Sequence, residues 1–319
     1  MNNVANSASA ATPQKGEWRV AAVLVVVMLI LEAFMRWWMH SSDSRVQSDN
    51  NNVRSLARTA REMRAYPGCK VLLVGNSLTR DGVEPSTMRA ALERAGRDHP
   101  QVFPCRPSGT SAPTWDYALH RYFLRTGDLP DEIFIFTGPG HLNDAMEDTA
   151  RLRNFFVHPD DLSRAWSWDV GSSEERLRFI FAQVSRLSGV EMTLKLQLFD
   201  RFIPRYTDME QLTNRARWQH IRTVAAPHEA SYRHLTLLLD ELRDRHILTH
   251  VVVMPVIYQA APLDPAAAKL IAEHAVDLID LSKIPELNAS HFSDGYHLNR
   301  SGAHILSAHL ADEIIARFR

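Results

Sequence analysis

Two short segments, far apart in the chain, carry residue types that could perform nucleophilic chemistry. In the first, the apolar run Val71–Val74 predicts a buried parallel strand, and the tight turn Gly75-Asn76-Ser77 follows it at once. A strand that ends in such a turn places Ser77 at the carboxyl edge of an open sheet, where α/β folds keep their sites. A serine hydroxyl there is a usable nucleophile if a base can reach it. The simpler interpretation is a serine that stabilises the turn or caps a helix.

The second segment supplies a candidate base. Asp294 and His297 lie three positions apart, a spacing that puts both side chains on one face of a turn or short helix. The carboxylate can then accept from one imidazole nitrogen while the other nitrogen faces Ser77. This is the serine–histidine–carboxylate arrangement, in which histidine removes the serine proton and the carboxylate orients the imidazole. Alternatively, His297 is a core histidine beside Tyr296 and Asp294 caps the turn.

These two segments resemble blocks of a known family. Residues 75–78, Gly-Asn-Ser-Leu, are similar to the first block of the SGNH (GDSL) hydrolases, with asparagine where many members have aspartate. Residues 294–299, Asp-Gly-Tyr-His-Leu-Asn, are similar to the last block. The resemblance covers residues 68–144 and 232–319. It implies a flavodoxin-like three-layer α/β/α fold, a serine nucleophile, and neither a metal nor an organic cofactor.

The family has two middle blocks that supply an oxyanion glycine and an oxyanion asparagine. Residues 108–111, Ser-Gly-Thr-Ser, match the glycine block and assign that role to Gly109. After the third strand the family usually shows Gly-x-Asn-Asp, whereas this chain has Gly138-Pro-Gly-His-Leu-Asn-Asp. The resemblance therefore implies Asn143 as the oxyanion asparagine, displaced by a few residues. Three nearby polar residues are interpreted as loop or surface residues, although the first could contact a substrate anion: Arg80, His141 and Asp144.

The N-terminal region differs in composition from the rest. Residues 1–17 are polar and without periodicity, and we expect a disordered cytoplasmic tail. Residues 18–39 contain an uninterrupted apolar run, Val20–Leu31, flanked by tryptophans. About 20 apolar residues make a spanning helix, and tryptophans belong at membrane interfaces. We expect an uncleaved transmembrane anchor over residues 18–39. The alternative is a cleaved signal peptide, although no small-x-small cleavage site follows.

The flanking charges do not choose an orientation for this helix. A single N-terminal anchor usually leaves the following domain outside, because long domains translocate largely regardless of charge. Related anchored SGNH proteins of bacteria are periplasmic. The resemblance thus implies a single-pass protein of the inner (cytoplasmic) membrane with a periplasmic catalytic domain.

Composition limits the remaining classes. Of the 319 residues, 45% are hydrophobic and 23% charged, which is ordinary for a globular protein. The formal net charge of −1 argues against a nucleic-acid surface. The sequence shows no internal repeat and no metal-ligand cluster. The two cysteines, Cys69 and Cys105, could form a disulfide in an extracytoplasmic domain or remain free thiols.

The chain beyond the anchor reads as a linker with a lead-in helix, residues 40–66, and one domain, residues 67–319. Predicted strands at 71–74, 102–105, 133–137, 251–255 and 278–281 alternate with predicted helices at 86–95, 115–125, 232–245 and 304–318. This alternation predicts a parallel sheet covered by helices on both faces. Residues 145–230 show helical spacing only. We interpret them as a helical insertion, either a lid over the site or a peripheral pack.

Together these features predict a membrane-anchored, extracytoplasmic serine esterase or O-acyltransferase. The resemblance implies acyl esters, acetyl esters foremost, of a carbohydrate or cell-envelope polymer, and a multi-spanning membrane acyltransferase as the partner that supplies acyl groups. Hydrolase and transferase share the same triad, so the sequence does not separate them. The alternative is a non-catalytic SGNH-like binding or assembly protein of an envelope polysaccharide complex.

Overall fold

The structure is a computed structural model that describes residues 15–41, 48–125, 129–144, 148–185, 202–203, 230–257 and 263–318. The expected disordered tail lies outside these residues, apart from its last three positions. Most of the second half of the expected insertion, residues 145–230, also lies outside them.

The domain is built on a five-stranded parallel sheet with strand order β2-β1-β3-β4-β5. The strands are β1 (Lys70–Val74), β2 (Gln101–Cys105), β3 (Glu132–Thr137), β4 (Leu248–Val253) and β5 (Asp277–Asp280). They form because short apolar runs, several rich in β-branched residues, can be buried on both faces of a parallel sheet. The order is that of the flavodoxin-like folds, and the predicted parallel α/β sheet is confirmed.

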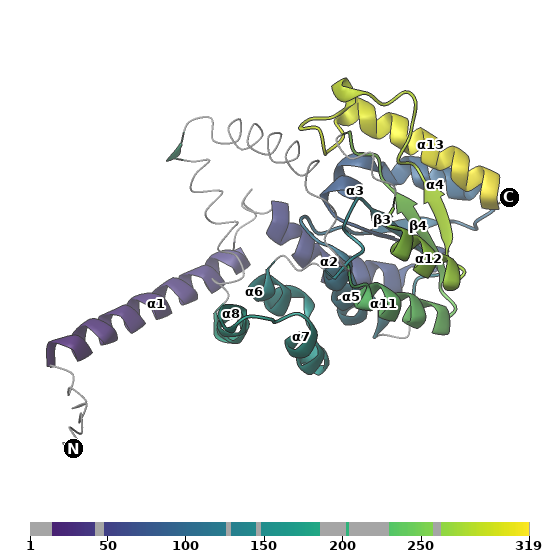
Figure 1. Cartoon of the computed structure of the whole chain (residues 1–319). Coiled ribbons are helices and arrows are strands. Elements are labelled where there is room, and N and C mark those ends of the chain that lie inside the picture. Colours follow the sequence, from purple (N-terminus) through teal and green to yellow (C-terminus); the bar gives the residue numbers. More distant parts are fainter. Residues whose placement is uncertain are drawn as a thin grey trace, which may run out of the picture.

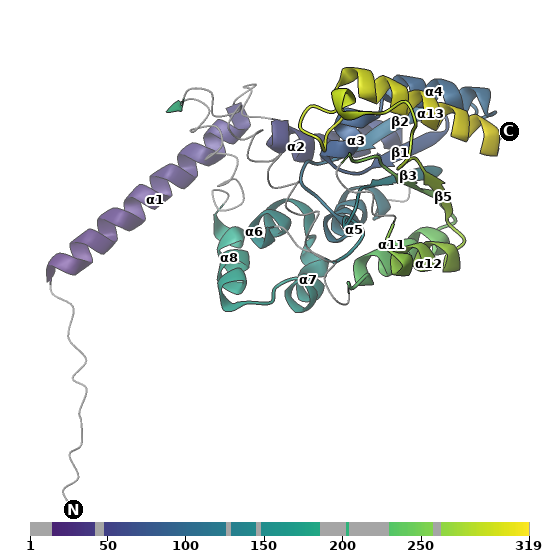
Figure 2. The same ribbon diagram turned by 45° about the horizontal axis from the view of Figure 1, so that its top comes forward.

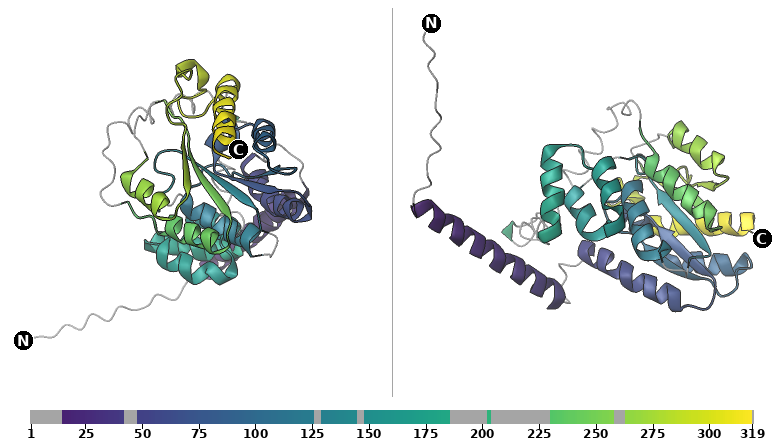
Figure 3. Two further views of the ribbon diagram at one scale, coloured as in Figure 1. Left: turned by 90° about the vertical axis from the view of Figure 1, so that its right-hand side faces the viewer. Right: turned by 90° about the horizontal axis from the view of Figure 1, so that it is seen from below.

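Helices cover both faces of this sheet (Figures 1 and 3). Leu72 and Val74 belong to a core that includes side chains of α2, α5, α11 and α12, whereas Val71 and Leu73 pack with α3, α4 and α13. The alternation follows from the strand period of two. These helices are α2 (Ser48–Ala65), α3 (Ser77–Gly82), α4 (Pro85–Arg94), α5 (Ala112–Leu119), α11 (Arg233–Asp244), α12 (Pro265–Glu273) and α13 (Arg300–Phe318).

Two of these helices were not predicted. Helix α3 begins at Ser77 itself, nine residues before the helix expected at 86–95. Its six residues are too few to show a helical period, and the Asn76 side chain starts it by accepting from the Leu78 N–H at 3.0 Å. Helix α12 follows Asp264, whose carboxylate caps the Ala266 N–H. Helix α5 continues as a π-helical turn, His120–Leu124.

The described part of the expected insertion is helical. It contains α6 (Thr149–Arg151), a π-helical turn (Leu152–Phe156), a 3₁₀ turn (Pro159–Asp161), α7 (Leu162–Trp168) and α8 (Ser173–Val184). Ser172 and Glu175 form a capping box that starts α8. Figure 2 shows α6, α7 and α8 together at the end of the domain that faces α1.

The N-terminal helix α1 (Lys15–Ser41) extends away from the domain (Figures 1 and 2). Its large apolar side chains between Val20 and Leu31 are 45–64% exposed. Within the described residues, no helix meets the length and apolarity that a membrane crossing requires. The cysteines are both free, Cys69 half-buried and Cys105 buried, so the disulfide alternative is not formed.

Candidate active site

The nucleophile turn joins β1 to α3 at the carboxyl edge of the sheet. Ser77 is the first residue of α3, and Asn76, just before it, has the extended backbone of a helix cap. A Cβ added to Gly75 would lie 2.0 Å from the Thr79 hydroxyl oxygen. Only glycine therefore fits between the strand end and the first turn of α3. The serine is held at a sharp strand-to-helix junction with its hydroxyl at the sheet edge.

The structure brings the three predicted triad residues together, although Ser77 and His297 are separated by 220 positions. The Ser77 Oγ lies 2.9 Å from His297 Nε2, and His297 Nδ1 lies 2.8 Å from Asp294 Oδ2. An Nδ1–H that donates to the carboxylate leaves Nε2 free to accept the serine proton. These contacts have the geometry that nucleophile activation requires.

The carboxylate of Asp294 is fixed by its own turn. Its Oδ1 accepts from the backbone N–H of Tyr296 at 2.9 Å and of His297 at 2.7 Å. Burial alone would raise the pKa of Asp294, but the hydrogen bonds from the His297 side chain and from these two N–H groups outweigh it and lower the pKa to about 2. Asp294 is therefore an anion at every pH at which the protein would work, and it can stabilise a charged imidazole.

Gly109 lies in a turn that packs against the nucleophile turn. It has a φ of 59°, in the left-handed region that glycine adopts without strain. The Asn76 amide donates to the Thr110 carbonyl at 2.9 Å, and the Trp115 indole donates to the Thr110 hydroxyl at 2.9 Å. Gly109 is thus positioned through its neighbour Thr110, which contacts the turn that carries Ser77 directly.

Asn143 lies in the loop that follows β3. Its side-chain nitrogen is 4.0 Å from the position of a Cβ on Gly140, which has a φ of 77°. The next residue, Asp144, was expected to be an ordinary loop residue, but its carboxylate accepts from the Arg233 and His234 N–H groups at the start of α11. The contacts of Asp144 fix the end of the loop. The oxyanion role of Asn143 stays a prediction.

His141, in the same loop, was interpreted as a loop or surface residue, and it is a half-buried loop residue that joins two turns of the site. Its Nδ1 accepts from the Gly138 N–H at 3.1 Å and lies 3.1 Å from the Asn76 amide nitrogen, and its Nε2 lies 2.9 Å from the Tyr296 hydroxyl. Burial, reinforced by the nearby His297, lowers the pKa of His141 to about 4. A neutral imidazole thus links the nucleophile turn to the turn of the triad.

The sequence gives little sign of this link. His141 stands among glycine, proline and polar residues, a composition that equally fits a solvated loop. Its position a few residues beyond a buried strand is the one signal that places it at the sheet edge. Tyr296 is marked only by lying between Asp294 and His297.

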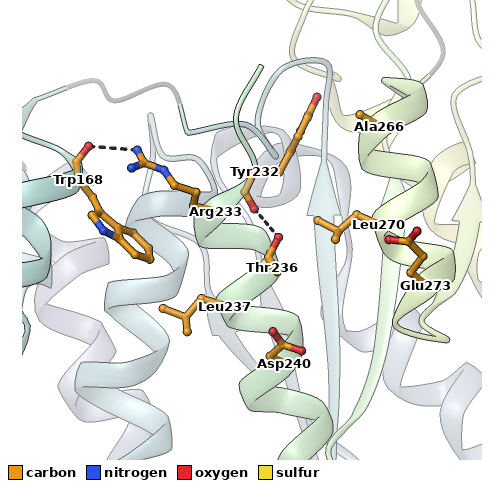
Figure 4. A pocket seen from close by; sticks show the side chains of 9 residues that line it. All are labelled: Trp168, Tyr232, Arg233, Thr236, Leu237, Asp240, Ala266, Leu270 and Glu273. Atoms are coloured by element: carbon orange, nitrogen blue, oxygen red, sulfur yellow. Dashed lines mark hydrogen bonds between the residues drawn. The ribbon is translucent and has the colours of Figure 1, made fainter. Parts of the chain in front are cut away.

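A separate hollow of about 520 Å³ lies between α7, α11 and α12 (Figure 4). Trp168, Tyr232, Arg233, Asp240 and Glu273 are among its lining residues, and no triad residue is. Arg233 donates to the Trp168 carbonyl at 3.3 Å and its guanidinium lies 5.1 Å from the Trp168 ring. Among the described residues, no group of three or more His, Cys, Asp or Glu side chains could hold a metal ion.

Comparison with solved structures finds several proteins to which this chain is similar. A lipase/acylhydrolase from Enterococcus faecalis is 15% identical, with 78% of this chain and 96% of that chain covered and a TM-score of 0.39. A putative acylhydrolase from Bacteroides fragilis is 11% identical, with 87% and 100% covered and a TM-score of 0.38. AlinE4, an esterase of the SGNH-hydrolase family, is 12% identical, with 79% and 97% covered and a TM-score of 0.33. No protein-family model and no curated protein matches the chain.

The chain is thus similar to esterases and acylhydrolases, one of them of the SGNH-hydrolase family, at low identity and low TM-score. The roles of its own residues rest on the geometry described above.

Proposed function

We propose that this protein is a serine-dependent esterase or acyltransferase of the SGNH type. One observation carries the proposal: the hydroxyl, imidazole and carboxylate of the candidate triad form an unbroken hydrogen-bonded chain, with contacts of 2.9 and 2.8 Å. These three hydrogen-bonded side chains come from two segments near opposite ends of the domain sequence. A serine that only capped a helix would not need a histidine at its hydroxyl or an anion behind that histidine.

The proposed reaction proceeds in two halves. His297 Nε2 takes the proton of Ser77 as Oγ attacks the ester carbonyl, and Asp294 stabilises the imidazolium that forms. The tetrahedral intermediate collapses to an acyl-serine, and His297 returns its proton to the departing alkoxide. His297 then deprotonates water or an acceptor alcohol, which attacks the acyl-serine and restores the free enzyme.

Oxyanion stabilisation comes from N–H donors at the same edge. We assign this role to the backbone N–H groups of Ser77 and Gly109 and to the side-chain amide of Asn143. Ser77 N–H is at the N-terminus of α3, and such groups point away from the helix without intrahelical partners. Removing one oxyanion donor typically costs about 3 kcal/mol of transition-state stabilisation. Asn143→Ala should therefore lower turnover by about a hundredfold if the amide is an oxyanion donor, and should change it little if Asn143 is only a loop residue.

For the substrate, we propose acyl esters, foremost acetyl esters, of a carbohydrate or cell-envelope polymer. We further propose that α1 anchors the protein in the inner membrane, with the domain on the periplasmic side, and that a multi-spanning acyltransferase supplies acyl groups. The apolar exposure of α1 supports the anchor, since such a surface is unfavourable in water. The resemblance of residues 75–78 and 294–299 to the SGNH blocks supports the substrate class.

The test is ester turnover by the purified full-length chain in detergent. Wild type should hydrolyse 4-nitrophenyl acetate, and Ser77→Ala should lose this activity while retaining its circular dichroism spectrum. Addition of an acceptor sugar, with the acetylated sugar quantified by mass spectrometry, separates transfer from hydrolysis. Equal activity of wild type and Ser77→Ala would remove the nucleophile assignment and favour a non-catalytic envelope-binding protein.

A further inference from the structure

Three arginines from different elements surround the turn that carries Gly109. Arg80 lies on α3, three residues after Ser77, and its Nη1 donates to the Ser108 hydroxyl. Arg151, in α6, donates to the Ser108 carbonyl at 2.7 Å and to the Gly109 carbonyl at 3.1 Å. Arg106 follows the end of β2 and completes the group. We call Arg80, Arg106 and Arg151 the arginine cluster.

The arginine cluster has little negative charge to balance it. Asp81 binds Arg80 through two contacts, Nε–Oδ1 at 2.8 Å and Nη2–Oδ2 at 3.0 Å. Within the part of the chain that the structure describes, neither Arg106 nor Arg151 lies within 4.0 Å of a carboxylate. Among the described residues, the cations of Arg106 and Arg151 thus have no carboxylate partner beside the candidate nucleophile, which leaves a positive field at this side of the site.

Arg106 is the member whose position is hardest to explain by structure alone. It is partly buried, and among the described residues the hydrogen bond of its guanidinium is a long one, 3.5 Å from Nη1 to the Arg80 carbonyl. Burial, and then repulsion from Arg80, lower the pKa of Arg106, whereas attraction to Asp81 opposes them. A cation that loses water without a paired anion costs free energy. Such a cost is commonly retained at a site that binds a charged ligand.

Resting on the proposed esterase or acyltransferase function, we propose that the arginine cluster binds an anionic group of the substrate next to the ester that Ser77 attacks. The substrate class is then an acylated acidic saccharide, with a carboxylate or a phosphate near the acyl group. A planar guanidinium matches both anions through paired N–H donors. Arg80 and Arg151 also support the turn that carries Gly109. A substitution of Arg106 therefore distinguishes substrate binding from support of this turn.

The experiment compares three acetylated sugars with the full-length protein: a uronate, the matching neutral sugar and a sugar phosphate. Wild type should show a lower KM for an anionic sugar than for the neutral one, and added salt should reduce this difference. Arg106→Gln should raise KM for the anionic sugar about tenfold more than for the neutral one, the size expected for a charge-assisted hydrogen bond. The uronate and phosphate arms identify which anion is preferred.

Two further variants guard this result. Arg106→Lys retains the charge and should recover part of the preference for the anionic sugar. Arg94→Gln removes the same charge from the exposed surface of α4 and should leave the preference unchanged. Equal losses on anionic and neutral sugars in Arg106→Gln would show a supporting role only, and a wild type without preference would overturn the subsite.

Direct binding separates this proposal from the proposed function. Calorimetry with the full-length Ser77→Ala variant measures affinity for each acetylated sugar without turnover. If wild type hydrolysed no ester, tighter binding of an anionic sugar that Arg106→Gln abolished would still establish the subsite. Equal, weak binding of all three sugars would reject it, whatever the activity of the wild type.

Discussion

The identity of residue 76 decides which hydrogen bonds can join the turns of the site. The Asn76 amide accepts from the Leu78 N–H through its oxygen, and its nitrogen donates to the Thr110 carbonyl and faces the unprotonated Nδ1 of His141. An aspartate, which many SGNH members have here, could accept but could not donate. Asn76 and a neutral His141 are therefore matched to each other.

Replacing Asn76 by aspartate should break this match. A carboxylate about 3 Å from His141 Nδ1 favours the imidazolium, so the pKa of His141 should rise from about 4 by about 1 to 3. A cation would then form near His297 in mildly acidic solution. Proton–carbon NMR of the His141 ring across pH measures the change. An unchanged titration in Asn76→Asp would contradict the proposed matching.

At Asp294 the prediction concerns the imidazole tautomer. Asp294→Asn would present an amide N–H or carbonyl to His297 Nδ1 and lose the anion, which should lower kcat by about 10⁴ with little change in fold. Because the pKa of Asp294 is about 2, protonation of this carboxylate should not limit wild-type activity between pH 5 and 9. Kinetics of both proteins from pH 5 to 9, with circular dichroism, test this. A variant equal to wild type at every pH would disprove the triad.

Among the elements, α5, α7 and α11 are joined by a buried charged network. His234 of α11, wholly buried, binds Asp116 of α5 through Nδ1 at 2.8 Å and Asp169 at the end of α7 through Nε2 at 2.9 Å. Arg164 also binds Asp116 at 2.9 Å, and the Tyr117 hydroxyl donates to Asp169 at 2.6 Å. Burial opposes the charge on His234, but its two carboxylate partners raise the pKa to about 9.

This network should make the folded protein less stable as the pH rises into the alkaline range. The pKa of His234 is higher in the folded chain than the value of about 6.5 expected when unfolded, so its contribution is complete below pH 6.5 and is lost as pH rises through about 9. The difference in Tm between wild type and His234→Gln should therefore shrink between these values. Scanning calorimetry from pH 6 to 10 measures it, and a constant difference would mean that His234 is not a cation in the folded protein.

The elements also show which features local sequence can reveal. Apolar runs such as Val71–Val74 predict strands because a buried strand needs a continuous apolar stretch, and the turn after the strand identifies Ser77. The spacing of Asp294 and His297 is equally local. The network around His234 and the arginine cluster join residues from separate elements, so no window of sequence contains them. Helix α3 was not predicted because about one and a half turns are too short to show the helical periodicity of apolar residues.

Across the whole molecule, α1 is the feature that leads to a prediction about location. We have proposed that α1, whose apolar side chains are exposed, anchors the protein. We expect the full-length chain to remain in the membrane fraction after carbonate extraction, since inserted helices resist this treatment whereas peripheral proteins are released. A variant lacking residues 1–40 should appear in the soluble fraction. Isolation of a mature protein whose N-terminus lies near residue 40 would contradict the anchor.

The central claim is that Ser77 is a nucleophile activated by His297, and covalent labelling tests it most directly. A fluorophosphonate probe should label the native full-length chain at one site, which peptide mass mapping should locate at Ser77. Ser77→Ala should not be labelled, and His297→Ala should react far more slowly, because the hydroxyl then lacks its base. Absence of labelling in the folded wild type, or equal labelling of wild type and Ser77→Ala, would contradict the account.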